Sequence, residues 1–520
     1  MNTLAVADYI IICVYVIGVL ALGIAFSGRQ KSMKEYFLAS GTMPWWAVSL
    51  SMAATMLSPI SFLGISGWIY AKDARYFFGP ALLLLISLPL AACLWVPIWS
   101  RLQTASIYPY LERRYHPGLR TFAAALFMIQ MTFWVGNGLV TASEAFADVT
   151  PLGARTCLVG IILLGTLYTM LGGSRAVIWT DVAQTIVFVF AFIVVGGMLL
   201  KHFDWQPMRI HQIASAVTSD EGYPKTQLFS TEFRLSVEAT IWALLLAKIM
   251  EILSFGSDQR RIQRLLATGT KRNMYKALFG LAGFQLLFMI LAIFVAWGFV
   301  AYYHGTPEAA LIKHDAVMPH YIASNLPILV RGVIMAGLLA AMMSTFDSAL
   351  NSMSSVTITD FYQRYFKTDA EEGHYVKSSR WATIAWGCVI LFFALWQMGF
   401  TETTVLQRIG QLNNLILPAV AIFFILGVFT KRCNTIGVLA GALTSILLVL
   451  CFSGFEGLMA PWVDPATFKV SWVWLEGLCT ALGCLVGYLA SFLFAAPPEE
   501  QLTELTIYEE AIDVADETTP

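Results

Sequence analysis

The sequence predicts an all-α protein that crosses a membrane many times, and its composition and its apolar runs carry that prediction. Of the 520 residues, 58% are hydrophobic and 12% are charged, whereas soluble domains average roughly 25% charged residues. Apolar runs of about 20 residues recur along the chain, which is the length of a helix that crosses about 30 Å of hydrocarbon. These runs do not alternate apolar and polar residues, as the strands of a membrane barrel would.

The apolar runs predict about thirteen spans, with ends placed to within about 2 to 4 residues. The expected spans cover residues 7–26, 43–70, 77–99, 119–147, 152–171, 176–200, 236–255, 277–302, 329–357, 380–399, 404–428, 433–454 and 472–495. An odd number of spans puts the two ends of the chain on opposite sides of the membrane. The opening residues MNTLAVADY lack the basic region of a signal peptide, so the first run is expected to stay in the protein as a helix.

The positions of Lys and Arg predict the orientation. About twenty of the 32 basic residues fall in one set of alternate connections between spans, and such connections are typically cytoplasmic. We therefore expect a multi-pass protein of the cell membrane with its N-terminus outside and its C-terminus in the cytoplasm. The net charge of -1 argues against a nucleic-acid partner, and the eight scattered cysteines show no metal-ligand spacing.

The second expected span is interrupted in its middle. Its stretch SMAATMLSPISFLGISGW carries Ser58, Pro59 and Gly64 at membrane depth, where proline removes a backbone donor and glycine weakens a helix. Broken helices at this depth are tolerated mainly where they line a cavity, and they point to the binding site of a transporter. A simple proline kink is the alternative.

The ninth expected span carries hydroxyl groups and a carboxylate in its second half. Ala341, Ser344, Thr345 and Ser348 lie three and four residues apart, so they share one helix face, and Asp347 lies beside it. This face resembles a set of oxygen ligands for a hard cation, and sodium is our candidate. A packing seam of small residues is an equally open interpretation.

Other ionisable residues also fall in or beside the expected spans. Asp181 lies just inside the sixth span, while Lys248 and Glu251 lie three residues apart in the seventh. We interpret Lys248 and Glu251 as a structural ion pair. Residues 497–520 are acidic and lack a sustained apolar face, so we expect a solvated tail.

Five stretches resemble the sodium:solute symporter family, which includes sodium-coupled carriers of glucose, proline, pantothenate, monocarboxylates and sialic acid. They occur in family order and extend over most of the membrane region. The stretches are SIYPYLERRY (106–115), GGSRAVIWTDVAQ (172–184), SDQRRIQRLL (257–266), AAMMSTFDSALNSMSS (340–355) and LPAVAIFFILGVFTKRCNTIGVLAG (417–441).

The resemblance implies a LeuT-like fold, in which a leading helix precedes two inverted repeats of five helices and further helices follow. The two repeats themselves are not visible in the residues. On this chain the implied parts are a leading helix and cytoplasmic loop (1–42), the first repeat (43–200), an external loop (201–235), the second repeat (236–428), C-terminal helices (429–496) and the acidic tail (497–520).

The resemblance also implies a sodium site between the broken helix and the hydroxyl-bearing helix. Its ligands in the family are two backbone carbonyls from the first helix, and a carbonyl with two adjacent hydroxyls from the second. The matching positions here are Ala54, Leu57, Ala341, Ser344 and Thr345. Some family members hold a second sodium, and the corresponding residues are Asp181, Ser344, Asp347 and Ser348. For Asp347, a proton-linked role and pairing with a basic residue remain alternatives.

The family binds its solute beside the broken helix, so polar residues on the surrounding helices are candidates for solute contacts. These candidates are Thr55, Ser58, Ser61, Gln130, Asn137, Trp242, Asp258, Gln285, Gln411 and Asn414. Compared with sugar carriers, Ser61 replaces a glutamine and Gln285 a lysine. The span 119–147 also lacks the arginine that sialic acid carriers use. Each candidate is equally open to interpretation as a residue that joins helices.

These expectations describe a sodium-coupled symporter that imports a small polar organic solute by alternating access, with a sugar or sugar derivative slightly favoured. An organic anion is the alternative solute. An ATP-driven pump would need a phosphate-binding GxxxxGK[ST], which the chain lacks. An enzyme is not expected, because the seven histidines are scattered. A channel or a solute sensor is a weaker alternative. The expected partners are Na+, the solute and the lipid bilayer, and the sequence does not predict an oligomeric state.

Overall fold

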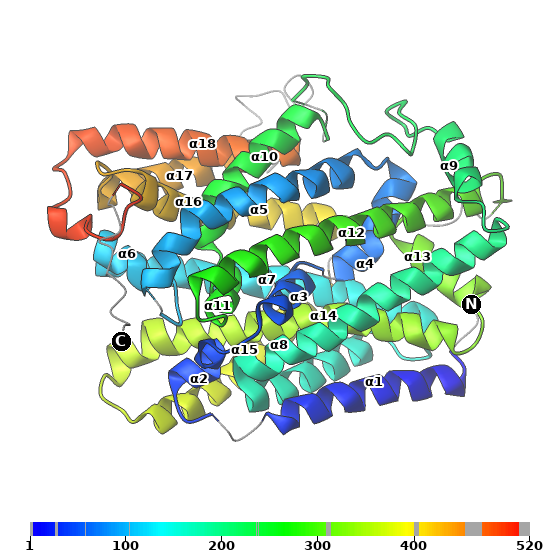
Figure 1. Ribbon diagram of the computed structural model, residues 1–520, viewed down its shortest axis with the longest axis horizontal. Helices are drawn as coiled ribbons and strands as arrows, with labels where there is room; N and C mark the ends of the chain where they lie inside the picture. The colour runs from blue at the N-terminus through cyan, green and yellow to red at the C-terminus, as the bar shows by residue number, and fades with distance from the viewer. Residues whose placement is uncertain are drawn as a thin grey trace, which may run out of the picture.

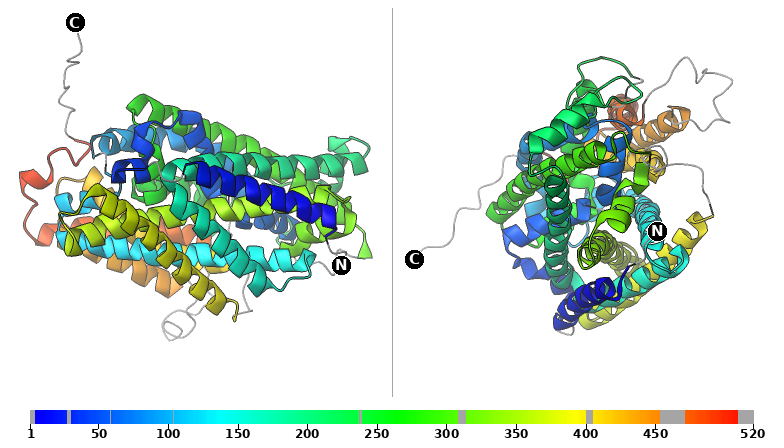
Figure 2. Two further views of the ribbon diagram at one scale, coloured as in Figure 1. Left: turned by 90° about the horizontal axis from the view of Figure 1, so that it is seen from below. Right: turned by 90° about the vertical axis from the view of Figure 1, so that its right-hand side faces the viewer.

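The computed structural model describes residues 4–26, 30–57, 59–102, 104–235, 237, 239–307, 314–399, 405–452 and 471–508. Within these ranges the chain is helical and forms no β-sheet. Figure 1 shows most long helices running side by side along the long axis of the molecule, and the right-hand view of Figure 2 looks along the bundle. The short helices α2 (Met33–Leu38), α6 (Pro109–Arg114) and α11 (Gln259–Leu266) lie at one end, opposite α9 (Pro207–Ala216) and α13 (Val317–Asn325).

The remaining helices follow the order of the expected spans. In the first half they are α1 (Val6–Ala25), η1 (Ala39–Gly41), α3 (Trp45–Met56), α4 (Pro59–Ala71), α5 (Arg75–Leu102), α7 (Pro117–Val149) and α8 (Ala154–His202). In the second half they are α10 (Ile241–Ser254), η2 (Phe255–Ser257), α12 (Lys271–Tyr303), η4 (His314–Ala316), α14 (Val330–Val356), η5 (Thr357–Phe366), α15 (Glu372–Gln397), α16 (Val405–Phe429), α17 (Thr435–Phe452), α18 (Trp472–Ala490), η6 (Ser491–Leu493) and η7 (Glu499–Gln501).

Among the described residues, nine helices are long and apolar enough to cross a membrane, and the bent pair α3–α4 makes a tenth. The thirteen expected spans exceed this count by three: α8 contains two of them, α10 has only 14 residues, and α16 counts as a shorter apolar helix over Leu415–Phe429. At about 1.5 Å per residue, the 49 residues of α8 would extend roughly 74 Å, far beyond one bilayer. The helix is interrupted at Gly173, whose φ of +60° suits glycine.

Side chains that cap helix starts fix several of these boundaries. Ser32 accepts a hydrogen bond from the Glu35 backbone N–H at the start of α2, and Thr240 accepts one from Ala243 at the start of α10. Asp258 accepts from the Arg260 N–H at the start of α11. Such caps satisfy backbone donors that have no partner within the helix.

Helix α14 lies inside the bundle and is buried along nearly its whole length. It packs most extensively against α8. A Cβ on Gly337 would lie 2.6 Å from the Cβ of Ala191, so the two helices approach too closely there for a larger side chain. The hydroxyl-bearing part of α14 is therefore enclosed by neighbouring helices.

The C-terminal segment differs from the expected solvated tail. Leu505 and Thr506 are buried, and Tyr110 donates a hydrogen bond to the Leu505 carbonyl (3.1 Å). The Ile507 N–H donates to the carbonyl of Val428 at the end of α16 (3.1 Å). The expectation of a solvated tail was wrong for residues 505–507. Two hydrogen bonds made by backbone groups and the buried Leu505 side chain anchor these residues, although the surrounding segment is acidic.

Candidate functional site

The break between α3 and α4 leaves backbone carbonyls next to α14 without helical hydrogen-bond partners. The two helices are bent by 55°. Helix α3 ends at Met56, and the next residue, Leu57, has φ and ψ of -86° and 84°, which are not helical. Carbonyls in the last turn of a helix have no helical partner and remain available to other donors or to an ion.

Helix α14 brings its hydroxyls to this break. The Ser344 Oγ donates to the carbonyl of Ala54 (3.2 Å) and lies 3.1 Å from the carbonyl of Ala341. The Thr345 Oγ1 is buried and has no hydrogen-bond partner among the described residues. The structure thus brings Ala54, Ala341 and Ser344 into contact and leaves one buried hydroxyl beside them unsatisfied.

These distances suit a hard cation. Oxygen ligands lie about 2.3 to 2.6 Å from Ca²⁺, whose size is close to that of Na+. Two adjacent ligands of such an ion are therefore roughly 3.3 to 3.7 Å apart in an octahedral arrangement. The 3.2 Å between Ser344 Oγ and the Ala54 oxygen is near this range. Carbonyl and hydroxyl oxygens are also the neutral donors that hard cations accept.

A second polar cluster lies one turn further along α14. The Asp181 Oδ2 accepts from the Ser51 Oγ (2.5 Å) and lies 3.2 Å from the Nη2 of Arg264. The Arg264 guanidinium also donates to the hydroxyls of Ser51 (2.8 Å) and Ser348. Three helices therefore meet through one buried arginine, since Ser51 belongs to α3, Asp181 to α8 and Ser348 to α14.

Asp347 has different partners from Asp181. Its Oδ2 accepts from the Tyr168 hydroxyl (2.8 Å) and its Oδ1 accepts from the Ser348 hydroxyl (3.3 Å). The side chain is fully buried, and no ion pair to a basic residue forms within the described ranges. The Ser348 Oγ thus lies next to Asp347 and 2.5 Å from the Ser344 carbonyl, and Arg264 links it to Asp181.

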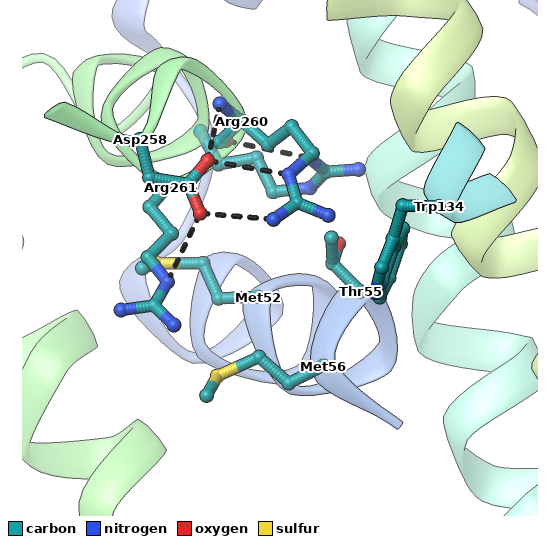
Figure 3. A pocket seen from close by; sticks show the side chains of 8 residues that line it. Met52, Thr55, Met56, Trp134, Asp258, Arg260 and Arg261 are labelled. Atoms are coloured by element: carbon teal, nitrogen blue, oxygen red, sulfur yellow. Dashed lines mark hydrogen bonds and ion pairs between the residues drawn. The ribbon is translucent and has the colours of Figure 1, made fainter. Parts of the chain in front are cut away.

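A small cavity opens beside the hydroxyl cluster (Figure 3). Its volume is about 180 Å³, and its lining residues are Met52, Thr55, Met56, Trp134, Asp258, Arg260, Arg261 and Arg264. Asp258 pairs with Arg260 (3.0 Å) and Arg261 (3.3 Å). The Arg260 guanidinium stacks 4.7 Å from the centre of the Trp134 ring.

A larger cavity of about 450 Å³ lies on the other side of Met56, Asp258 and Arg261, which line both cavities. Helices α5, α10, α12 and α18 form most of its wall, and Gln285 lies in it. Its volume suits a small organic molecule. Met56, Asp258 and Arg261 therefore lie at the boundary between the two cavities.

The candidate solute residues divide into three groups. Thr55, Asp258 and Gln285 line the cavities, and Ser61 hydrogen bonds to the carbonyl of Met56 (3.4 Å). Gln130 and Asn137 are buried away from both, and Trp242 is 47% exposed and bonds to the Thr231 carbonyl. Ser58 lies outside the described residues, as do the side chains of Gln411 and Asn414.

Sequence reasoning missed the arginines of this region. Arg264 is one of the basic residues in the connections that the Lys and Arg distribution predicts to be cytoplasmic. In the structure it is only 5% exposed, and its guanidinium reaches Asp181. A usable signal was the spacing in SDQRRIQRLL, where Arg260 and Arg264 lie one helical turn apart. The sequence analysis also gave no role to Ser51 or Glu476.

Comparison with solved structures defines the class of protein. The substrate-bound outward-open state of a Na+-coupled sialic acid symporter superposes with a TM-score of 0.82 at 25% identity, covering 95% of this chain and 99% of that one. The fold is therefore the expected LeuT-like fold, and the protein is a multi-pass membrane transporter rather than an enzyme.

The family follows from the sequence comparisons. The model of the sodium:solute symporter family matches residues 36–445, and the chain belongs to this family. It is 29% identical over 496 residues to the sodium/sialic acid symporter NanT of Aliivibrio fischeri, covering 94% of this chain and 93% of the relative. It is also 29% identical over 453 residues to the sodium/sialic acid symporter SiaT of Proteus mirabilis, with coverages of 85% and 88%. The protein is a sodium-coupled solute symporter.

Proposed function

We propose that this symporter imports its solute with a sodium ion held by the carbonyls of Ala54, Leu57 and Ala341 and the hydroxyls of Ser344 and Thr345. One observation carries this assignment: the Ser344 hydroxyl reaches the Ala54 carbonyl while the Thr345 hydroxyl beside it is buried without a partner. An unsatisfied buried hydroxyl costs about 1 to 3 kcal/mol. A bound cation would remove this cost.

The position of the site explains the coupling. Sodium bound between α3 and α14 draws the broken helix toward α14 and so favours the conformation that binds solute. Once the site opens to the cytoplasm, the ion leaves and the two helices separate. Each sodium that moves down a potential of 100 mV supplies about 2.3 kcal/mol, and that energy is available to accumulate the solute.

A second sodium site at Asp181, Ser344, Asp347 and Ser348 is also part of the proposal. The Asp181 Oδ1 is buried and has no hydrogen-bond partner among the described residues, while Arg264 occupies the Oδ2 side. A sodium ion would add the positive charge that Asp347 lacks. Arg264 and the ion would then compete for Asp181, because both are attracted to the same carboxylate.

The solute is a small polar organic molecule, and a sugar or sugar derivative is the first candidate. The two named relatives are sialic acid symporters, which supports an organic anion as the second. We further propose that the N-terminus lies outside the cell and that the end bearing α2, α6 and α11 is cytoplasmic. The basic residues of these short helices support that orientation.

Sodium binding at Ser344 is tested by the thermal unfolding midpoint of the purified protein as NaCl replaces KCl at constant ionic strength. Ser344→Ala is expected to raise the sodium concentration for half-maximal stabilisation by about tenfold or more, because a ligand is lost. Ser354→Ala is the matched control: it lies on the same helix and hydrogen bonds to the Ser379 carbonyl. An unchanged sodium response in Ser344→Ala would contradict the site.

A further inference from the structure

The larger cavity contains a carboxylate that its neighbours do not neutralise. On the α10 side, Glu251 pairs with Lys248 (2.5 Å) and with Arg261 (3.3 Å), and Arg261 also lies 3.3 Å from Asp258. These side chains therefore satisfy one another. Across the cavity, Glu476 projects from α18.

Glu476 faces the cavity rather than the lipid. The cavity lining includes Glu476 and Val473 from α18. A Cβ on the adjacent Gly477 would lie 2.6 Å from the Cγ of Leu246, so α18 packs closely on α10 at this level. Val473 and Trp474 are buried in a cluster with Leu244. The half-buried Glu476 side chain is thus fixed inside the protein.

No hydrogen bond or ion pair to the Glu476 carboxylate forms within the described part of the chain. A charged side chain at membrane depth costs roughly 2.5 to 3.5 kcal/mol on insertion scales, so such residues are normally paired or functional. The charges lining the cavity are Lys248 and Arg261 against Glu251, Asp258 and Glu476. Asp258 is also paired with Arg260 (3.0 Å), so Glu476 is the one lining carboxylate without an ion-pair partner among the described residues.

We propose that Glu476 binds a protonated amino group on the transported solute. An ammonium group in the cavity would give Glu476 the ion-pair partner that it lacks, and an ammonium–carboxylate pair is strong where water is excluded. Lys248 has three N–H donors and a single acceptor among its described contacts. Its remaining donors suit hydroxyl or carboxylate oxygens on the same solute. The cavity thus fits an amino sugar or an amino acid, and these share the amine that Glu476 recognises.

This inference rests on the proposed function, since it assigns the cavity to the solute of the symporter. It is tested on the whole purified protein in NaCl with paired probes that differ in an amine: glucosamine against glucose, and γ-aminobutyrate against butyrate. In at least one of the two pairs, we expect the compound that carries the amine to raise the thermal unfolding midpoint more than the compound without it. A response to glucosamine would indicate an amino sugar as the solute, whereas a response to γ-aminobutyrate would indicate an amino acid.

Substitutions at Glu476 then identify the group responsible. Glu476→Gln is expected to weaken binding of the preferred amine by about tenfold or more, because the charged partner is lost. Glu476→Asp keeps the charge and is expected to retain the preference for the amine, with weaker affinity. If Glu476→Gln does not fold, loss of the amine preference in Glu476→Asp would contradict the inference. Glu232→Gln is the control, since Glu232 is exposed on the loop before α10.

Two further results would overturn the inference. One is a panel in which no amine binds better than its partner. The other is a Glu476→Gln variant with its amine preference intact. Stabilisation by sodium alone, measured on the same samples without any organic probe, reports on the Ser344 site. A failure of the amine inference is therefore distinguishable from a failure of the proposed sodium site.

Discussion

The guanidinium of Arg264 lies 3.2 Å from the carboxylate of Asp181, and both side chains are almost completely buried. The pair joins α11, at one end of the bundle, to the interior of α8. Because Arg264 also contacts Ser51 and Ser348, it couples α11 to both helices that form the proposed sodium site. Movement of α11 would then alter the charge around Asp181.

The coupling between Arg264 and Asp181 is measurable by a double-mutant cycle. Removing one partner of a buried ion pair leaves the other charge unpaired and costs about 3 to 5 kcal/mol. We expect Arg264→Gln and Asp181→Asn each to lower the free energy of unfolding by about this amount, and the double variant to lose clearly less than the sum. Denaturant unfolding in detergent at fixed NaCl measures these changes. Additive losses would show that the two residues act independently.

The kink within α8 depends on Gly173. Its φ is +60°, and a Cβ there would lie 2.8 Å from the Tyr36 carbonyl oxygen. We expect Gly173→Ala to destabilise the protein by about 1 to 3 kcal/mol, because both the backbone conformation and the contact become strained. Thermal unfolding measures the loss. Gly197→Ala is the control on the same helix, since a Cβ there meets nothing within 4 Å. Equal effects of the two substitutions would contradict this account.

The fold was largely predictable because its signals are local. An apolar run of span length predicts a helix wherever it occurs, and Pro59 next to Ser58 predicts the break before α4. The face of α14 was predictable for the same reason, since the spacing of Ala341, Ser344 and Thr345 is fixed by the helix itself. The Ser344 hydroxyl reaches the Ala54 carbonyl of the broken helix, and it was the resemblance to the family, rather than helix periodicity, that implied a meeting of these two helices.

The missed residues depend on contacts between distant parts of the chain. Arg264 lies 83 residues from Asp181, and in sequence it resembles any basic residue of a cytoplasmic loop. Glu476 faces Lys248 and Glu251 across a cavity that exists only when α18 packs on α10. Composition and periodicity do not specify which helices become neighbours. Arg264 was therefore counted with a cytoplasmic connection, and Glu476 was given no role.

The Glu112 carboxylate predicts a dependence of stability on pH. Hydrogen bonds and charge from Arg364 and Arg120 hold the pKa of Glu112 at about 2, below the usual 4.5. Since the pKa is lowered by folding, the stabilisation is complete above pH 4.5 and is lost as pH falls toward 2. We expect Glu112→Gln to cost about 1 kcal/mol at pH 7, because the group is partly exposed.

Thermal unfolding midpoints of the wild type and Glu112→Gln at pH 7 and pH 3.5 would check this dependence. The difference between the two proteins is expected to shrink at the lower pH, where the carboxylate is partly protonated in the unfolded chain. Glu35→Gln is a useful comparison, because Glu35 accepts a hydrogen bond from the exposed N–H of Lys31 and forms no ion pair within the described residues. A gap between wild type and Glu112→Gln that stays constant with pH would contradict the assignment to Arg364 and Arg120.

The anchored C-terminal segment provides a further prediction about the end of the bundle that bears α6. Truncation after Pro498 removes Leu505 and Ile507, whose backbone groups bond to Tyr110 and Val428. It also removes the Tyr508 hydroxyl, which donates to the Phe429 carbonyl (2.9 Å). Each net hydrogen bond contributes about 0.5 to 1.5 kcal/mol, so we expect the truncated protein to be less stable by about 2 to 4 kcal/mol.

Truncation after Tyr508 is the matched control, because it removes acidic residues and keeps all three hydrogen bonds. It is expected to leave the thermal unfolding midpoint within about one degree of the full-length protein, since surface changes away from such contacts usually have small effects. Equal destabilisation by both truncations would assign the effect to the charge of the tail instead of its anchoring. Because the segment joins the ends of α6 and α16, loss of its contacts should also increase hydrogen exchange at residues 109–114 and 426–429.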